Sequence, residues 1–343
     1  MQDLSQCARK GGSLAIMFAL CACVASMPWW AHRYTEQWTI EFLYTLALAQ
    51  SWNLLAGYGG LLSVGQQAFI GAGGYMLVLL GVQAGLNPFL IIPIAGLVCA
   101  VLAVPIGKLV FRLRGANFAV GTWVVAEVLR LLVTNTHMLG GGSGTSITST
   151  LMGIPVWWRF SATLWVALGL GAGGTLLVYA LLRSKLGLAL TSVRDNESAA
   201  ASLGVSVNKM KWLVYLAAAL WAGMAGALIF ITKLRISPDA AFSIDWTTTI
   251  FFVVVIGGIG TVEGPVLGTL VFFLLRGALA DYGSWYLIAL GAVAAGFMVW
   301  APGGLWGLVM RVSGLQLFPV RRQPPTPGEI APLLKPHTLS GKV

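Results

Sequence analysis

Long apolar runs fill most of this 343-residue chain, and no other feature limits its possible folds as strongly. Hydrophobic residues make up 57% of the chain, charged residues make up only 9%, and the mean hydropathy is +0.83. Soluble domains carry about 25% charged residues, and a soluble core could not hide this much apolar surface. We therefore expect an all-α fold, that of a polytopic integral membrane protein.

The apolar runs predict about ten transmembrane helices. The first run, about 14–31, has the flanks of a secretory signal, but we favour a retained span because bulky aromatic residues follow at Trp29 and Trp30. The remaining runs lie near 39–56, 61–81, 88–107, 115–135, 163–182, 212–232, 247–262, 266–281 and 285–301.

The distribution of basic residues predicts the orientation in the membrane. If the amino terminus is cytoplasmic, 15 Lys and Arg fall on the cytoplasmic side, and four fall outside: Arg33, Arg159, Lys233 and Arg235. This topology also places the carboxyl terminus in the cytoplasm. We expect residues 1–13 to be a cytoplasmic segment, 14–310 to be the membrane domain, and 311–343 to be a disordered, Pro-rich cytoplasmic tail.

Charge and cysteine content exclude other classes of protein. The net charge of +10 does not indicate nucleic-acid binding, because the basic residues are scattered in short loops and do not gather on one face. The spacing of the four cysteines fits neither a disulfide framework nor a zinc site. We interpret them as small apolar side chains: Cys7, Cys21, Cys23 and Cys99.

Residues 191–211 form the longest polar run of the chain. Ser192 and Asp195 have the spacing of a helix capping box, three alanines follow, and Gly204 supplies a stop. A helix over 193–203 would be roughly 16 Å long, half of what a bilayer requires. It must therefore lie outside the membrane, either as a docking element for another protein or as a plain linker.

The sequence of this run resembles a known family. Ser192-Val-Arg-Asp-Asn-Glu-Ser-Ala-Ala-Ala-Ser-Leu-Gly-Val is similar to the cytoplasmic loop of branched-chain amino acid ABC transporter permeases, the LivH/LivM group, and to its LivM type in particular. The resemblance implies that the loop 183–211 contacts an ATPase subunit. The residues that would couple to the ATPase are Arg194, Asp195, Asn196, Glu197, Ala199, Ala200 and Gly204.

A second motif lies inside the predicted third span. Gly65-Gln-Gln-Ala-Phe-Ile-Gly-Ala-Gly-Gly-Tyr75 resembles the G-Q-x-x-F-x-G-x-G-A-Y pattern of the same family. Small residues let membrane helices approach closely. We expect the run 169–174 to be a packing seam of this kind, and the run 222–227 is a candidate for one. Gln66 and Gln67 must either bind a neighbouring helix or line a wet path, because a buried amide without a hydrogen bond is costly.

Glu127 and Arg130 lie three residues apart in the predicted fifth span, so they share one helical face. Ionisable residues inside a membrane indicate function by default, but this pair lies in the outer third of the span, where an arginine can reach the interface. Both interpretations stay open: a structural ion pair, or a role beside the transport pathway. The glycine-rich stretch 139–145 that follows is expected to be a flexible outer loop.

The third motif is Gly257-Gly-Ile-Gly-Thr-Val-Glu-Gly-Pro-Val-Leu-Gly268, which resembles the family's G-G-x-G-T-x-x-G-P-x-x-G pattern. Such a density of glycine breaks a membrane helix, and broken backbone is tolerated at that depth only where protein or water satisfies it. It is either a tight turn between two spans or part of the pathway, with these candidate residues: Gly257, Gly258, Gly260 and Glu263. Glu263 is expected on the cytoplasmic side.

No motif for an energy source or for bond-making chemistry is visible. The chain lacks a G-x-x-x-x-G-K-[ST] loop, a G-x-S-x-G elbow and a plausible metal-ligand set, so we expect a transport subunit that is not an enzyme and needs no cofactor. An ion-coupled secondary transporter is the alternative class. It would need ionisable groups near mid-membrane, where only Glu127, Arg130 and Arg276 qualify.

The family resemblance covers roughly residues 40–310 and implies a set of partners. These are a second, LivH-like permease subunit, two ATP-binding subunits and a periplasmic substrate-binding protein, assembled in the lipid bilayer of a bacterial inner membrane. Substrates of the family are chiefly leucine, isoleucine and valine, whereas close relatives carry urea or short amides. The sequence does not choose between these substrates, because selectivity rests largely on the binding protein.

Overall fold

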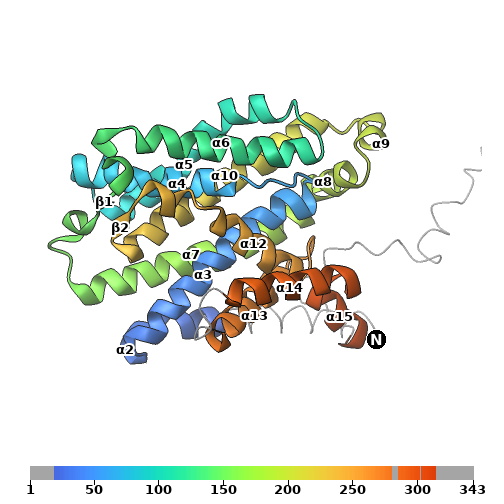
Figure 1. The fold of residues 1–343 in the computed structure, drawn as a ribbon. Helices are drawn as coiled ribbons and strands as arrows, with labels where there is room; N and C mark the ends of the chain where they lie inside the picture. Colours follow the sequence, from blue (N-terminus) through green and yellow to red (C-terminus); the bar gives the residue numbers. More distant parts are fainter. Residues whose placement is uncertain (1–18, 280–284, 302, 314–343) are drawn as a thin grey trace, which may run out of the picture.

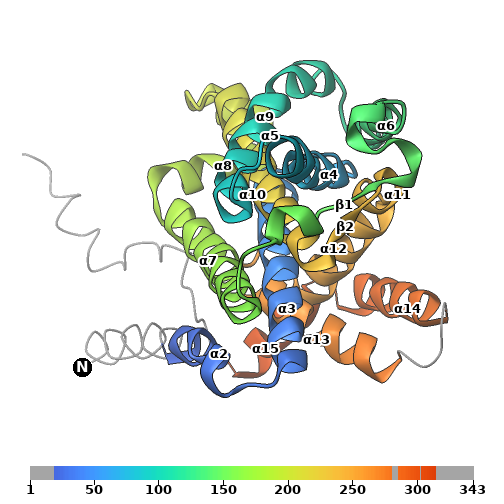
Figure 2. The same cartoon turned by 90° about the vertical axis from the view of Figure 1, so that its left-hand side faces the viewer.

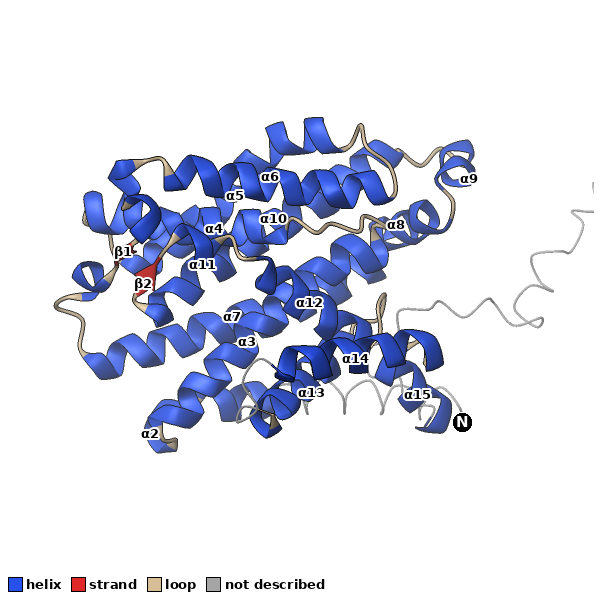
Figure 3. Cartoon of the chain, in the orientation of Figure 1, coloured by secondary structure: helices blue, strands red, loops and turns tan. Residues whose placement is uncertain are grey.

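The computed structural model describes residues 19–279, 285–301 and 303–313, and these residues are almost entirely helical (Figure 3). The all-α expectation is therefore confirmed. The expected amino-terminal segment 1–13 and the tail beyond residue 313 lie outside the described residues, as do Cys7 and the start of the first predicted span. That span is helical at 19–25 and continues as α2 (Met27–Trp30).

Five helical stretches among the described residues are long and apolar enough to cross a membrane. They are α5 (Pro88–Val110), α6 (Ala116–Thr134), α7 (Val156–Arg183), α10 (Val207–Lys233), and α11 (Pro238–Ala241) taken together with α12 (Ile244–Gly257). A bent pair, α14 (Trp285–Trp300) and α15 (Gly304–Ser313), could count as a sixth. The multi-pass architecture follows from these helices, while the number ten stays a prediction.

The other predicted spans are shorter or irregular helices. Two of them change from α-helix to π-helix: α3 (Arg33–Asn53) continues into η1 (Leu54–Tyr58), and α4 (Gln66–Met76) continues into η2 (Leu77–Gln83). A third, α13 (Gly264–Ala278), has 15 residues. π-helical turns are rare and often mark functional sites, because they leave backbone groups without their usual partners.

Short elements gather at the two ends of the helices. Figure 1 shows β1 and β2 at one end, and α8 (Lys185–Asp195) and α9 (Glu197–Ser202) at the other. The first end also carries η3 (His137–Leu139), η4 (Gly141–Ser143) and η5 (Thr148–Leu151). Strands β1 (Thr145–Ser146) and β2 (Arg235–Ile236) pair antiparallel, with Thr145 opposite Ile236.

This pairing corrects the expectation of a flexible loop at 139–145. The stretch forms two short 3-10 turns and then joins β2, and the Arg235 guanidinium donates a hydrogen bond to the Ser143 carbonyl at 3.1 Å. Local sequence could not predict this pairing, because the partner of Thr145, Ile236, lies 91 residues later in the chain.

In a chain that crosses the membrane repeatedly, alternate loops lie at the same end, and the contacts between loops agree with this pattern. Gln83 donates to the Met138 carbonyl at 2.7 Å, and Arg33 lies over the Phe160 ring, so the loops after the first, third and fifth predicted spans share one end. At the opposite end, Arg194 reaches the Gly57 carbonyl. The contacts are compatible with the predicted topology, and which end faces the cytoplasm stays a prediction.

Helices α3 and α10 form the centre of the molecule, with α4, α5, α7 and α12 around them (Figure 2). Helix α10 is 72% buried over its most apolar stretch. It packs on α4 through glycines: a Cβ at Gly73 would lie 2.7 Å from the Gly223 carbonyl carbon, and one at Gly226 would lie 2.8 Å from the Ile70 carbonyl carbon. The seam predicted from small residues therefore exists between these two helices.

The second small-residue run, 169–174, contains four glycines, and two of them pack closely on neighbouring helices. A Cβ at Gly171 would press on Leu43 of α3, and a Cβ at Gly174 would press on the Trp221 indole of α10. Gly169 and Gly173 have no atom within 4 Å of such a Cβ. The difference follows from the helical period, because residues two apart lie on opposite sides of α7.

We predict that Gly73→Ala destabilises the protein, whereas Gly173→Ala does not. Alanine at position 73 would force α4 away from α10, and overpacking of this kind costs about 1–3 kcal/mol. Alanine at position 173 meets no neighbouring atom and improves helix propensity by roughly 1 kcal/mol. Thermal unfolding of the two variants in detergent measures the difference, and equal Tm values would contradict the close crossing of α4 and α10.

Candidate functional site

The glycine-rich motif forms a turn, residues 258–263, that joins α12 to α13 inside the protein. Gly258 and Gly260 have φ values of +124° and +74°, which side chains with a Cβ rarely adopt. Gly257 packs directly on the Gly264 backbone, which leaves no room for a Cβ. The motif is therefore a tight turn, and Glu263 in it is buried, with 7% of its surface exposed.

Two buried amides of α3 bind the backbone of this turn. Asn53 donates to the Thr261 carbonyl at 2.7 Å and accepts from the Gly260 N–H at 2.8 Å. Gln50 donates to the Val262 carbonyl at 2.8 Å. Because Gln50 and Asn53 are fully buried, these bonds give the turn's backbone groups the partners that neither water nor lipid supplies there. We call residues 258–263 together with Gln50 and Asn53 the amide clasp.

Arg194, at the end of α8, reaches the amide clasp from outside. Its guanidinium donates to the Gly57 carbonyl at 3.1 Å and also pairs with Asp195 at 2.9 Å. The stem of the side chain lies against Gly60. On the inner side Gly57 abuts the turn, since a Cβ on Gly57 would lie 2.7 Å from the Gly260 nitrogen. The contacts bring the polar run and the glycine motif together.

The polar run contains two helices, which corrects the expected single helix over 193–203. Helix α8 continues to Asp195, and α9 begins at Glu197 with Asn196 as its cap, where the Asn196 side chain accepts from the Ala199 N–H at 3.0 Å. Ser192 lies inside α8 and donates to the Ala189 carbonyl. The reason is burial: Leu190 and Val193 hold the end of α8 against the protein.

The end of α9 agrees with the prediction. Gly204 has a φ of +84°, its N–H donates to the Ala201 carbonyl, and the Val205 N–H donates to the Ala200 carbonyl. This is the Schellman arrangement that glycine favours. Ala200 is buried and Ala199 is exposed, while Glu197 forms an ion pair with Lys211 at 2.6 Å. Lys211 is a partner that the sequence did not predict.

The two glutamines of α4 contact neighbouring helices. Gln66 donates at 3.4 Å to both the Ser51 hydroxyl of α3 and the Ala218 carbonyl of α10. Gln67 accepts a hydrogen bond from Thr247 of α12. The sequence left two possibilities open for these glutamines, and these contacts are of the kind that binds neighbouring helices.

Glu127 and Arg130 form the expected ion pair, at 2.6 Å, and a third charge joins them. The Arg130 guanidinium also contacts Asp239 of α11 at 2.6 Å, which ties α6 to the short helix before α12. At the end of the molecule that carries β1 and β2, the Arg130 side chain is partly exposed, and the side chains of Glu127 and Asp239 are exposed. The cluster is thus remote from the amide clasp.

The sequence reasoning missed the residues that hold the candidate site together: Gln50, Asn53 and Gly57. A signal was present, because Gln50-Ser-Trp-Asn53 is a polar cluster inside an apolar run and the glycine-rich stretch 57–60 follows it. Nothing local indicated their partner, which lies about 210 residues later in the chain. For the residues that the structure describes, no group of acidic, His and Cys side chains could hold a metal ion.

Comparisons with known proteins give the chain a family. Residues 34–309 match the family described as branched-chain amino acid transport system / permease component. The chain is 29% identical over 314 residues to the high-affinity branched-chain amino acid transport system permease protein LivM of Escherichia coli (strain K12). The matched region covers 84% of this chain and 74% of that protein.

More distant relatives are also similar. The probable branched-chain amino acid transport permease protein LivM of Methanocaldococcus jannaschii is 25% identical over 231 residues, covering 64% of this chain and 66% of the relative. The fructose import permease protein FruG of Bifidobacterium longum is 25% identical over 291 residues, covering 80% and 83%. No solved structure matches the chain.

We predict that Asn53→Leu destabilises the protein by about 2–4 kcal/mol, because it leaves the Gly260 N–H and the Thr261 carbonyl buried without partners. Thermal unfolding in detergent measures the loss. Asn135→Leu is the matched control, since Asn135 is exposed and bonds only within its own helix, to the Leu131 carbonyl. An unchanged Tm for Asn53→Leu would show that these two bonds do not hold the turn.

We predict that exchanging the charges of Glu127 and Arg130 destabilises the end of the molecule that carries β1 and β2. The exchange places a carboxylate at position 130, where the Arg130 guanidinium now contacts Asp239 at 2.6 Å. Adding Asp239→Lys to the exchange should restore the Tm, whereas Asp239→Asn alone should cost only about 0–1 kcal/mol, as exposed pairs do. An exchanged variant as stable as the wild type would exclude Asp239 as a partner.

Proposed function

This chain belongs to the branched-chain amino acid transport permease family, and on that premise we propose that it is the transmembrane permease subunit of an ATP-driven ABC importer. The observation that carries the proposal is α9, a short helix outside the predicted spans with a cap at each end. Such a helix is rigid before any partner binds, so docking costs little ordering entropy. We name the stretch from Asn196 to Gly204, which contains α9, the docking segment.

The docking segment exposes residues of the kind that a groove in another protein can bind. Leu203, at the tip of α9, has 82% of its surface exposed, and the Glu197 side chain has 56% exposed. An exposed leucine beside a half-exposed carboxylate offers an apolar anchor and a charge-assisted contact, and the latter is worth about 1.5–3 kcal/mol when partly buried. We propose that it docks on the ATPase from the cytoplasm.

The proposal implies separate subunits for energy and for selectivity. Two ATP-binding subunits would hydrolyse ATP, because the chain itself carries no phosphate-binding loop. A second, LivH-like permease subunit would complete the membrane unit in a bacterial inner membrane, and a periplasmic binding protein would deliver the substrate. The tie of α3 to the turn 258–263 by the amide clasp is consistent with a membrane core that moves as a unit.

We propose leucine, isoleucine and valine as substrates, because the LivM relatives carry that description in their names. The name of the FruG relative makes a sugar the second candidate, and urea or a short amide is a third. Binding of leucine, urea and fructose to the partner binding protein, measured by calorimetry, separates them.

An ion-coupled transporter is a weaker alternative. Its candidate charges Arg130 and Arg276 are engaged in ion pairs, with Glu127 and Asp239 and with Glu41. Uptake driven by an ion gradient in liposomes that contain this chain alone would favour it over the importer.

We predict that Glu197→Lys and Gly204→Val leave the protein in the membrane at normal abundance but abolish co-purification of the ATPase and substrate-stimulated ATP hydrolysis. The first variant reverses the charge of the docking segment. The second forces a β-branched residue to a φ of +84° and so redirects the chain after α9. If both variants retain the ATPase and transport at wild-type rates, the docking segment is only a linker.

A matched control separates docking from the internal ion pair of Glu197. Combining Glu197→Lys with Lys211→Glu restores a pair between the two positions, which are 2.6 Å apart in the structure, but keeps the reversed charge on α9. We expect the double variant to remain defective. Recovery of ATPase binding would instead mean that Glu197 acts through Lys211 and does not contact the ATPase.

A further inference from the structure

Three segments of the chain meet at a single backbone carbonyl, that of Gly57. This carbonyl lies near the end of the π-helical η1, where the last carbonyls of a helix have no partner within the helix. Arg194 supplies the donor at 3.1 Å, and the glycine turn packs on the other side of Gly57. The contact therefore joins the end of α8, which leads directly into the docking segment, to the end of α3 and the turn between α12 and α13.

The contact at Gly57 is supported differently on its two sides: several hydrogen bonds hold the inner side, whereas one side-chain hydrogen bond reaches it from the outer side. Within the protein, the amide clasp binds α3 to the turn by three hydrogen bonds of 2.7–2.8 Å. On the side of α8, Arg194 donates its hydrogen bond to the Gly57 carbonyl, and the stem of the Arg194 side chain packs on Gly60. A displacement of the docking segment can thus reach α3 and the turn together through this side chain, alongside the packing of α8 on η1 and α10.

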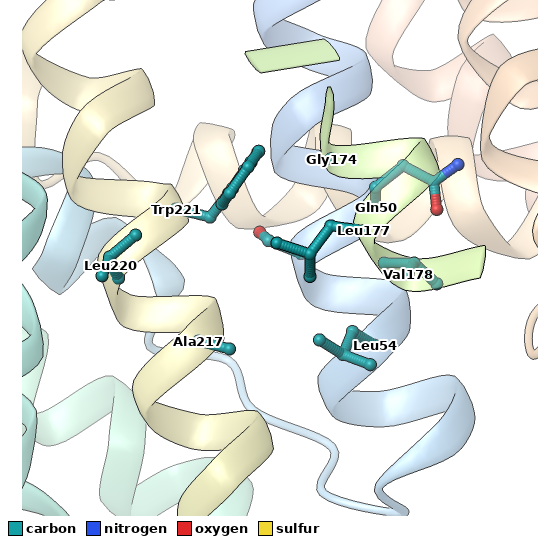
Figure 4. Close-up of a pocket in the computed structure, with 9 residues that line it drawn as sticks. Gln50, Leu54, Gly174, Leu177, Val178, Ala217, Leu220 and Trp221 are labelled. Atoms are coloured by element: carbon teal, nitrogen blue, oxygen red, sulfur yellow. The ribbon is translucent and has the colours of Figure 1, made fainter. Parts of the chain in front are cut away.

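A pocket lies beside the end of α3. A cavity of about 170 Å³ separates α3, α7 and α10, and Gln50 and Leu54 line it from the α3 side (Figure 4). Ala217 and Trp221 of α10 face it from across the gap. Well-packed interiors contain few voids larger than a water molecule, so α3 is not closely packed against α7 and α10 along this side, and the pocket leaves it room to shift.

We propose that Arg194 is the positioning residue that transmits movement of the docking segment to the membrane core, by holding the Gly57 carbonyl. The inference rests on the proposed function, because it assumes that an ATPase moves the docking segment. It differs from that function in assigning to Arg194 a task that begins after docking. The bond from Arg194 to Gly57 couples ATP hydrolysis to transport, and the exposed face of α9 binds the ATPase.

The experiment compares Arg194→Ala, Arg194→Lys and Lys185→Ala in the complete complex, purified through the ATPase and reconstituted in liposomes. Lys185 is the matched control, because it is an exposed cation at the start of the same helix. For Arg194→Ala we expect normal ATPase co-purification and hydrolysis, with transport per ATP reduced about tenfold or more, the effect of losing one charge-assisted hydrogen bond. Arg194→Lys should fall between it and the wild type, and Lys185→Ala should match the wild type.

Two outcomes overturn the proposal and leave the proposed function intact. If Arg194→Ala loses the ATPase, Arg194 belongs to the docking contact; if it transports at the wild-type ratio to ATP, the bond to Gly57 does not couple the two. Failure of the proposed function has a different signature. In that case the wild-type chain binds no ATPase and moves no solute, whichever residue stands at position 194.

Discussion

Wherever a helix breaks inside this protein, the freed backbone groups must find partners within the chain, because lipid supplies none. Two such breaks are placed against each other: the π-helical end of α3 and the glycine turn between α12 and α13. The Asn53 side chain donates a hydrogen bond to the Thr261 carbonyl of the turn and accepts one from its Gly260 N–H. These hydrogen bonds fix α3 relative to α12 and α13, and other helices pack around these three.

Close approach of helices supplies the rest of the stability. The hydrophobic effect does not draw helices together within a bilayer, so contact area and hydrogen bonds must do so. Glycines of α4 and α10 allow the two backbones to touch, and Gln66 then reaches both α3 and α10 from the same surface. Small residues and buried amides act together here, since an amide can bind across a helix interface only when the backbones are close.

The two ends of the molecule are built differently, and the difference matches the proposed division of labour. At one end β1 and β2 pair, and Arg130 ties α6 to α11, so the loops there are held by backbone and ionic contacts. At the other end α8 and α9 project beyond the long helices, and Arg194 is the side chain that reaches back to Gly57. The first end is thus held by its own contacts, whereas the second suits movement that a partner drives.

The sequence by itself determined the features that depend on local composition and spacing. Hydropathy predicted the membrane class and the long helices, the three-residue spacing predicted the pair of Glu127 and Arg130, and the glycine after three alanines predicted the turn at Gly204. Each of these depends on residues within one or two turns of helix, so local periodicity suffices. The motifs of the glycine turn and of the docking segment were equally visible, but not the connection between them.

Tertiary structure alone decided which of several locally reasonable options was taken. Ser192 and Asn196 are both good helix caps, and the burial of Val193 in α8 selects Asn196. Asp239 joins Arg130 across 109 residues, Asn53 binds the turn across 208, and Arg194 reaches Gly57 across 137. Such contacts depend on how whole helices pack against one another, and a single sequence carries no local signal for a partner that only the folded arrangement brings near.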